Sequence, residues 1–403
     1  MSELFRHGKF ARENGREKGL ERMDWMRRYP MVEDLRAKAR ARLPHFAFEY
    51  LDAGTGTEEC LARNRAAFGR IALEPRYLRG ALEPDLTASL FGKSYGAPFG
   101  IAPVGLASLI WPGAERALAQ TASRFSLPYT LSTVGGETIE RIGEAAGGMG
   151  WFQLYTPRDE TVAVDLLARA ERSGFSVLLV TVDVPVPSRR ERMRRAGITM
   201  PPGVSPRLAW QAAQKPAWTL ATLRHGQPRF KTMETYAPAR DLASVAAYVH
   251  DQVHSVLDWA YLDRLRTYWK GPMVLKGVMS VADALQAKAA GVDGLLLSNH
   301  GGRQLDAAPA PVEALADIRK AVGDEMALMV DSGVRCGLDI VRALALGADF
   351  VLLGRAFHYG VAALGPGGGD HVAEILLEET RNVMAQIGRE RFGELEGALA
   401  SGS

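Results

Sequence analysis

Eight short apolar runs, most of them followed by a segment with helical periodicity, constrain this chain more than any other feature of its sequence. The runs are rich in Val, Leu and Ile and alternate little, which is typical of strands buried on both faces. They cover residues 99–105, 129–134, 150–155, 177–183, 272–277, 294–299, 327–333 and 350–355. Helical patterns lie between them, at 114–125, 161–173, 281–290, 312–322 and 338–346. Eight strand–helix units predict an α/β fold, a closed (β/α)8 TIM barrel rather than an open doubly wound sheet.

Two regions fall outside this repeat. Residues 1–98 precede the first strand, and we expect an N-terminal arm, disordered at its start, followed by a helical cap. The barrel is predicted over residues 99–388, and residues 389–403 form a C-terminal tail. Residues 184–271 separate the fourth and fifth strands, and this connection is much longer than a usual βα loop. Long loops on the C-terminal face of a barrel usually cover its active site, so we expect this insertion to be a lid.

Composition and charge limit the class of protein. Of the 403 residues, 47% are hydrophobic and 24% charged, as in ordinary globular proteins. Cys60 and Cys336 cannot form a disulfide framework, and no apolar run has the length of a signal peptide core or a membrane span, so we expect a cytoplasmic protein. The net charge is +3, but residues 189–240 hold eleven Lys and Arg against two acidic residues. The rest of the chain is therefore net acidic, which argues against a whole-protein role in nucleic-acid binding.

One segment, residues 297–306, carries the strongest chemical signal. Its sequence is Leu-Ser-Asn-His-Gly-Gly-Arg-Gln-Leu-Asp, so the sixth strand ends at His300, two glycines follow, and Arg303 lies three residues beyond. A base that titrates near neutrality beside a bidentate carboxylate binder is what deprotonation of a small organic acid requires. The alternative is a surface loop with a capping histidine and a solvated arginine.

The other strand ends strengthen the chemical interpretation, because the C-terminal ends of barrel strands converge on one mouth. Polar or glycine-containing ends follow the strands at Pro103–Val104–Gly105, Ser132, Gln153, Tyr155, Thr181, Asp183, Lys276, Asp331, Gly333, Arg335, Gly354 and Arg355. Any one of them could be an ordinary loop contact. Together they predict a catalytic mouth that needs no metal ion.

The last two strand ends indicate a phosphate-bearing cofactor. Gly333, Arg335, Gly354 and Arg355 fit the usual barrel phosphate site, where backbone amides and a helix N-terminus bind the anion; ordinary turn glycines are the alternative. Lys276 would stabilise negative charge on a reduced cofactor ring. These features favour FMN over a nicotinamide, and the Gly-x-Gly-x-x-Gly fingerprint is absent from the barrel core.

With these residues the chain resembles the FMN-dependent α-hydroxy-acid oxidases and dehydrogenases, the family of glycolate oxidase, lactate dehydrogenase and mandelate dehydrogenase. The resemblance runs from about residue 30 to 388, and residues 298–306 with Ala308-Pro309 are its most specific motif. It implies that His300 is the active-site base and Asp183 its partner, and that Arg303 and Arg190 bind the substrate carboxylate. Its further implications are two pocket tyrosines, Tyr50 and Tyr155; isoalloxazine contacts at Pro103, Val104, Gly105, Ser132, Gln153, Thr181 and Lys276; and ribityl and phosphate contacts at Asp331, Arg335, Gly354 and Arg355.

Three positions depart from parts of the family. Residues 331–333 read Asp-Ser-Gly where plant and animal oxidases have Asp-Gly-Gly, although bacterial respiratory members also have the serine. Val134 replaces a tryptophan of plant glycolate oxidase, so we expect a pocket for a side chain larger than that of glycolate. Gly105 stands where oxidases tend to have alanine, which favours poor oxygen reactivity.

The resemblance implies oxidation of an (S)-2-hydroxy acid, lactate- or mandelate-like, to the 2-oxo acid. Arg303 and Arg190 fix the carboxylate, His300 takes a proton, Asp183 steadies the imidazolium, and Lys276 offsets charge on reduced FMN. The sequence leaves open whether His300 removes the α-proton or the hydroxyl proton. Family members are often tetramers, so a homo-oligomer, a tetramer, is expected.

The basic segment 189–240 has two interpretations. Its arginines are interleaved with Leu208, Trp210, Trp218, Leu220 and Leu223, which suits peripheral contact with the inner face of the cell membrane and transfer of electrons to a quinone or another acceptor. Alternatively it is a solvated lid whose tryptophans pack on the barrel or on a sister subunit.

Three alternative functions remain at this stage. An oxidase would pass electrons to oxygen and produce hydrogen peroxide. A non-redox FMN barrel, such as the flavin-dependent isopentenyl-diphosphate isomerase, would need a diphosphate site, whereas His300, Arg303 and Arg190 suit a carboxylate. A barrel that binds FMN without catalysis would lack a catalytic residue, and none is missing.

Overall fold

A closed barrel of eight parallel strands forms the centre of the molecule, as the sequence predicts. The computed structural model describes residues 24–198, 205–252 and 257–400, so the start of the predicted N-terminal arm lies outside the described residues. The strands follow one another around the barrel in chain order. They are β3 (Phe99–Ile101), β4 (Tyr129–Ser132), β5 (Gly150–Leu154), β6 (Val177–Thr181), β7 (Met273–Lys276), β8 (Gly294–Leu297), β9 (Ala327–Val330) and β10 (Phe350–Leu353).

Each strand is shorter than the apolar run that predicted it, and the difference lies mostly at the C-terminal end. The run predicted at 294–299 pairs only to Leu297, and the one at 327–333 only to Val330. The residues that follow leave the ladder because their side chains and amides bind other groups at the barrel mouth.

A ring of helices covers the barrel. It comprises α6 (Ala114–Phe125), α7 (Ile139–Ala146), α8 (Glu160–Arg172), α13 (Trp259–Tyr268), α14 (Val281–Ala289), α15 (Pro311–Val322), α16 (Gly337–Ala345) and α17 (Arg355–Leu364), with α18 (Gly368–Gln386) packed outside α16 and α17. Side chains of Thr138, Asp159, Asp258 and Ser280 accept hydrogen bonds from the first turns of α7, α8, α13 and α14, which explains where these helices begin.

Residues 24–98 are not wholly helical. Residues 24–28 are helical, and three further helices follow, α2 (Val32–Arg42), α3 (His45–Asp52) and α4 (Glu59–Gly69). After them the chain is mostly extended and forms the hairpin of β1 (Ala88–Leu90) and β2 (Lys93–Tyr95). Phe91 and Gly92 turn the hairpin with φ of 52° and 73°, a two-residue turn without the usual Asn-Gly signal. The hairpin closes one end of the barrel, where the Trp151 indole donates to the Tyr95 hydroxyl at 3.0 Å.

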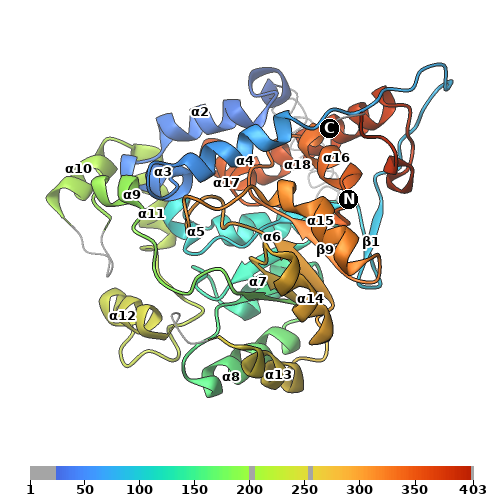
Figure 1. Cartoon of the computed structure of the whole chain (residues 1–403). Helices are drawn as coiled ribbons and strands as arrows, with labels where there is room; N and C mark the ends of the chain where they lie inside the picture. The colour runs from blue at the N-terminus through green and yellow to red at the C-terminus, as the bar shows by residue number, and fades with distance from the viewer. Residues whose placement is uncertain (1–23, 199–204, 253–256, 401–403) are drawn as a thin grey trace, which may run out of the picture.

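The insertion between β6 and β7 is helical. It contains α9 (Glu191–Arg195), α10 (Pro206–Ala213), α11 (Pro216–His225), α12 (Leu242–Gln252) and α13, which packs beside α8 in the ring. In Figure 1, α2, α3 and α4 lie across the top of the molecule, α9 to α11 gather beside α3 at the left, and α12 stands apart below them. The N-terminal helices and the insertion therefore meet over one side of the barrel.

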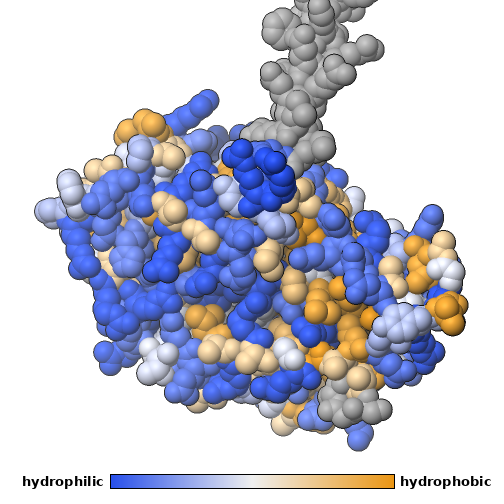
Figure 2. Space-filling view, turned by 90° about the horizontal axis from the view of Figure 1, so that it is seen from above, coloured by the Kyte–Doolittle hydropathy of each residue, from blue (hydrophilic) through white to orange (hydrophobic). Residues whose placement is uncertain are grey.

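The surface is mainly hydrophilic on the face seen from above, with a hydrophobic area toward the right of that view (Figure 2). No helix in the described part of the chain combines the length and the apolar character required to cross a bilayer. The C-terminal segment ends with the 3-10 helix Phe392–Leu395 and a bridge between Leu73 and Leu399.

Candidate active site

His300 follows β8 and is held between an acid and a phenol. Its Nδ1 lies 3.1 and 3.2 Å from the two carboxylate oxygens of Asp183, and its Nε2 lies 3.3 Å from the hydroxyl of Tyr155. Burial alone would raise the pKa of Asp183, but Lys276 and His300 outweigh it and lower that pKa to about 2. An ionised carboxylate can only accept, so Nδ1 carries the hydrogen and Nε2 is the basic atom.

The charge state of this group suits a base. Burial lowers the pKa of His300, and the nearby Lys276 ammonium adds to that effect while Asp183 opposes it. Burial also raises the pKa of Tyr155 to about 12, so its hydroxyl stays protonated and can donate to Nε2. At neutral pH the imidazole is therefore neutral and ready to accept a proton.

Lys276 joins the base to the next strand ends. Its Nζ donates to Ser298 Oγ at 2.9 Å and lies 3.8 Å from Asp183 and 3.7 Å from Asp331. Burial alone would lower the pKa of this ammonium, but the two carboxylates outweigh it and raise the pKa. Lys276 therefore keeps its positive charge inside the barrel mouth.

Two arginines supply positive charge on the other side of His300. Arg303 is partly buried, one of its terminal nitrogens donates to the Tyr50 carbonyl, and its Nε has no hydrogen-bond partner among the described residues. Burial and the neighbouring Arg190 and Arg355 lower the pKa of Arg303 to about 9, so it is still a cation at neutral pH. Arg190 Nε donates to Ser188 at 3.1 Å, which leaves its terminal nitrogens for a ligand. This pair can bind a carboxylate.

The loop that carries His300 is anchored to the N-terminal helices. Asn64 on α4 and Asn299 exchange two buried amide hydrogen bonds, 2.8 and 2.6 Å long. Asp306 accepts from the backbone amides of Thr57 and Cys60 at the start of α4. His300 itself has a φ of +58°, a strained conformation that such anchoring makes possible.

A second anchor fixes the helix that follows Arg190. Arg192 donates to three carboxylates, Glu49 at 2.6 Å, Glu58 at 2.8 Å and Asp52 at 2.9 Å. Asp52 also accepts from Arg36 at 2.7 and 3.0 Å. Since α9 is only five residues long, this network rather than the helix itself holds the insertion against α3.

Three of the strand ends predicted to contact a flavin ring are linked to one another by buried side-chain hydrogen bonds. Ser132 Oγ donates to Gln153 Oε1 at 2.7 Å, and Gln153 Nε2 donates to Thr181 Oγ1 at 2.8 Å. Thr181 pairs in register with Lys276. These three side chains are buried behind the cavity wall, whereas Pro103, Val104, Gly105 and Lys276 form the wall itself.

The residues present fit FMN. Gly354 precedes α17, so backbone amides of that helix's first turn face the cavity with buried Arg335 nearby. Gly333 has a φ of +101°, and a side chain there would meet the Asn64 carbonyl at 2.3 Å, so the close approach requires glycine. Arg355 also lines the cavity, but its three nitrogens donate to the carbonyls of Leu51, Ala53 and Gly301. Two of its five N–H groups therefore have no partner among the described residues.

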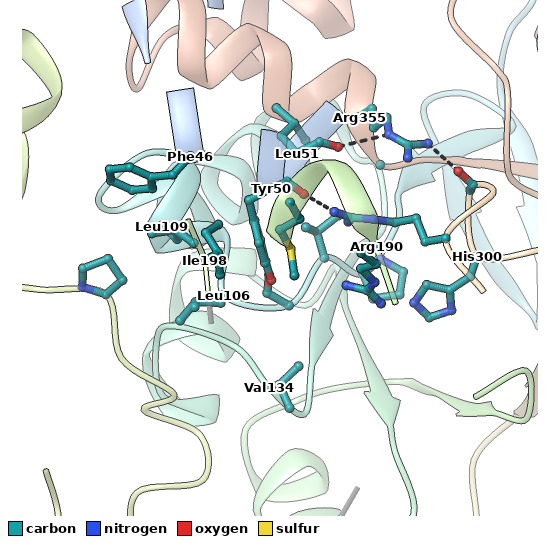
Figure 3. A pocket seen from close by; sticks show the side chains of 18 of the residues that line it. Phe46, Tyr50, Leu51, Leu106, Leu109, Val134, Arg190, Ile198, His300 and Arg355 are labelled. Carbon is teal, nitrogen blue, oxygen red and sulfur yellow. Dashed lines mark hydrogen bonds between the residues drawn. The ribbon is translucent and has the colours of Figure 1, made fainter. Parts of the chain in front are cut away.

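One cavity of about 1170 Å³ joins these groups, and it exceeds the ~1,000 Å³ upper range of pockets for a single drug-sized ligand. Figure 3 shows Arg190 and His300 on one side of Tyr50, and Phe46, Leu106, Leu109 and Ile198 on the other. The predicted site residues that line the cavity are Tyr50, Pro103, Val104, Gly105, Tyr155, Arg190, Lys276, His300, Arg303, Asp331, Gly333, Arg335, Gly354 and Arg355. Ser132, Gln153, Thr181 and Asp183 stand behind it.

Sequence reasoning missed several supporting residues. Ser298 accepts from both Lys276 and the His300 amide, and Ser332, with a φ of +70°, donates to Asp331 at 2.6 Å and accepts from the Gly301 amide. Both lie inside motifs that the sequence singled out. Asn64 and Arg192 carried no such signal, because their partners are about 130 or more residues away along the chain.

Comparisons with known proteins identify the family. The sequence profile of the FMN-dependent dehydrogenases matches residues 39–401. An L-lactate dehydrogenase of Azorhizobium caulinodans is 38% identical over 90% of this chain and 96% of its own length, and one of Caulobacter vibrioides is 40% identical over 88% and 93%. The crystal structure of a monotopic membrane protein, (S)-mandelate dehydrogenase, superposes with a TM-score of 0.87 at 36% identity, covering 92% of this chain and 98% of that one.

The chain belongs to the FMN-dependent dehydrogenase family. Its activity is accordingly that of an FMN-dependent oxidoreductase that acts on the CH–OH group of 2-hydroxy acids.

Proposed function

We propose that this protein oxidises an (S)-2-hydroxy acid to the 2-oxo acid and passes the electrons to a quinone rather than to oxygen. The observation that carries the proposal is the placement of a neutral, oriented His300 beside Arg303 and Arg190 in one cavity. FMN, when bound, accepts the two electrons of the oxidation. The remaining roles belong to the side chains of this chain.

The arginines bind and orient the substrate. The unpartnered Nε of Arg303 and the free terminal nitrogens of Arg190 would receive the carboxylate. Tyr50 is positioned on the same side, because its hydroxyl donates to the Gly105 carbonyl at 2.7 Å and its ring lies 5.5 Å from the Arg303 guanidinium. Burial raises the pKa of Tyr50, so its hydroxyl stays protonated and the side chain lines the site without a charge.

His300 Nε2 would take the proton that the reaction releases. In doing so the imidazole becomes a cation, and Asp183 at 3.1 Å stabilises that cation through Nδ1. Tyr155, which donates to Nε2 in the present arrangement, would turn its hydroxyl toward the substrate oxygen instead. Lys276 would place a fixed positive charge beside the reduced cofactor.

Surface chemistry of the insertion supports the proposed membrane-bound acceptor. Trp210, Leu220 and Leu223 are 67%, 65% and 77% exposed, and the exposed Arg207 and Arg224 lie on the same two helices. Trp218, in contrast, is buried and donates to the carbonyls of Leu109 and Ile110, so it packs on the barrel. A cluster of exposed apolar side chains flanked by arginines can bind the surface of an anionic membrane, because the apolar side chains insert between the lipids and the arginines pair with the headgroups.

Sedimentation with vesicles tests this surface. Vesicles that contain phosphatidylglycerol should bind the wild type and should bind the Trp210→Glu, Leu220→Glu double variant much less, while turnover with a soluble dye stays unchanged, because neither residue lines the cavity. Equal sedimentation of both proteins would contradict membrane contact at α10 and α11.

Anaerobic reduction tests the chemistry and the acceptor together. A panel of (S)-2-hydroxy acids should bleach the bound flavin, and the reduced protein should then reoxidise slowly in air and rapidly with a quinone analogue. Fast reoxidation in air with release of peroxide would indicate the oxidase alternative. Failure of every 2-hydroxy acid to bleach the flavin would refute the proposed substrate class.

We also propose that the protein is a homo-oligomer, a tetramer by family resemblance. Tyr77 and Leu78 are exposed on the extended segment that follows α4, where a second copy could cover them. Light scattering at micromolar concentration should give a mass of four chains, and a monomer mass would contradict the proposal.

A further inference from the structure

The cavity has two chemically different ends. His300, Arg190 and Arg303 form the polar end, and across Tyr50 the walls are aliphatic and aromatic (Figure 3). Phe46, Leu109 and Ile198 belong to that second end, with Trp218 and Phe230 from the insertion. Because both ends belong to one cavity, a molecule held at the polar end can extend into the apolar one.

The apolar end is preorganised. The rings of Phe46 and Trp218 pack edge to face with centroids 5.5 Å apart, and Trp218 Nε1 donates to the carbonyls of Leu109 and Ile110 at 3.2 Å. Phe46 and Trp218 are both buried in the molecule. An apolar wall that is already fixed loses little entropy when it receives a ligand group.

The substituents of the reacting carbon direct the substrate side chain to this end. The reacting carbon bears four substituents. The proposed function binds the carboxylate at Arg303 and Arg190, and the C–H and O–H bonds that break must face His300 Nε2 and the FMN site. The fourth substituent, the side chain, must take the remaining direction. The lining residues that are assigned neither to these bonds nor to FMN include the apolar ones of the second end.

Resting on that proposed function, we propose that this enzyme is selective for 2-hydroxy acids with a large apolar side chain, aryl or long alkyl, over lactate. The balanced reaction is R–CH(OH)–COO⁻ to R–CO–COO⁻ with loss of two protons and two electrons, and the two electrons pass through FMN to the acceptor. Leu109 on α5 (Ala107–Ile110) is a specificity-determining residue, because it lines the apolar end without a role in the chemistry.

Burial of hydrocarbon sets the size of the expected preference. Each methylene removed from water contributes roughly fourfold in affinity. We therefore expect kcat/KM for (S)-2-hydroxyoctanoate and for (S)-mandelate to exceed that for (S)-lactate by about tenfold or more. If kcat/KM is highest for lactate, the inference is wrong and the proposed function still stands.

Variants of Leu109 test where the side chain lies. Leu109→Trp should reduce kcat/KM for 2-hydroxyoctanoate and mandelate about tenfold or more and leave lactate within about twofold. Leu109→Phe adds less bulk and serves if the tryptophan variant does not fold. Leu285→Trp on α14 is the matched control, since Leu285 is exposed and lies outside the cavity. This control variant should leave kcat/KM unchanged for both the large acids and lactate.

The measurement is the rate of anaerobic flavin reduction by each acid, followed separately by reoxidation with a quinone analogue. Loss of rate with large acids alone supports the inference. Equal losses of rate with all three acids would overturn the inference and indicate that Leu109 only maintains the structure of the site. Slowing of reoxidation alone would also overturn it and indicate that the apolar end binds the electron acceptor. Absence of reduction by any of the acids would instead refute the proposed function.

Discussion

At the residue scale, the chemistry depends on which atom of His300 is basic. Ionised Asp183 fixes the hydrogen on Nδ1, and burial lowers the pKa of the imidazole from its ordinary 6.5. A neutral base loses activity only when it becomes protonated. The acid limb of kcat/KM should therefore have its midpoint below pH 6.5, with full activity at neutral pH. A pH profile with an acid limb centred at pH 7 or above would contradict this state of His300.

Arg303 provides a second prediction at the same scale. Arg303→Lys keeps the positive charge but loses the planar fork and the buried Nε, which has no partner among the described residues. We expect kcat/KM to fall by about 10²-fold or more, because a bidentate carboxylate contact is lost. FMN content, measured by absorbance after denaturation, is the control and should stay equal to that of the wild type. Full activity of the lysine variant would remove Arg303 from substrate binding.

At the scale of elements, the loop after β8 is positioned by α4. The reciprocal pair of Asn64 and Asn299 is buried, so Asn64→Ala leaves a buried amide without its partner. We expect destabilisation of about 1–3 kcal/mol and a lower kcat, because His300 lies next to Asn299. Arg70→Ala, which removes an exposed ion pair with Glu313 beside the same helix, is the control and should cost under about 1 kcal/mol. Loss of stability with unchanged kcat would show that Asn64 does not position the base.

The same scale shows why sequence reasoning succeeded where it did. All eight barrel strands were predicted because each is a buried apolar run bounded by turn signals, and the residues that follow them reach one mouth by the geometry of parallel strands. The β1–β2 hairpin was not predicted, because its turn is Phe91-Gly92 and its strands are only three residues long.

Contacts between distant segments were beyond the reach of sequence patterns. Asn64 pairs with a residue 235 positions later, and Arg192 binds acids about 140 positions earlier. Neither residue type carries a local signal for such a partner. The apolar end of the cavity likewise assembles from α3, α5 and the insertion, which no single motif describes.

At the scale of the whole molecule, the N-terminal helices and the insertion together cover the barrel mouth. Arg192 of the insertion connects the two through hydrogen bonds to three carboxylates of the N-terminal segment. Arg192→Met leaves Glu49, Asp52 and Glu58 without this partner. We expect the midpoint of thermal unfolding to fall by roughly 4 °C or more, since a partly buried charge network is broken. We also expect kcat/KM to fall, because Arg190 precedes the helix that Arg192 holds.

A neighbouring position gives the control for that prediction. Arg195→Met removes an exposed charge from the same short helix and should change neither the unfolding midpoint nor kcat/KM. If both variants behave alike, the contact between the insertion and α3 does not contribute to the site.

In the proposed reaction, His300, oriented by Asp183, accepts the proton released when a 2-hydroxy acid is oxidised. The anaerobic rate of flavin reduction by (S)-mandelate in the wild type and in Asp183→Asn tests this role. We expect rapid bleaching in the wild type and a loss of about 10²-fold or more in the variant, with FMN still bound, because the imidazolium loses its counter-charge. Equal rates in the two proteins would contradict it.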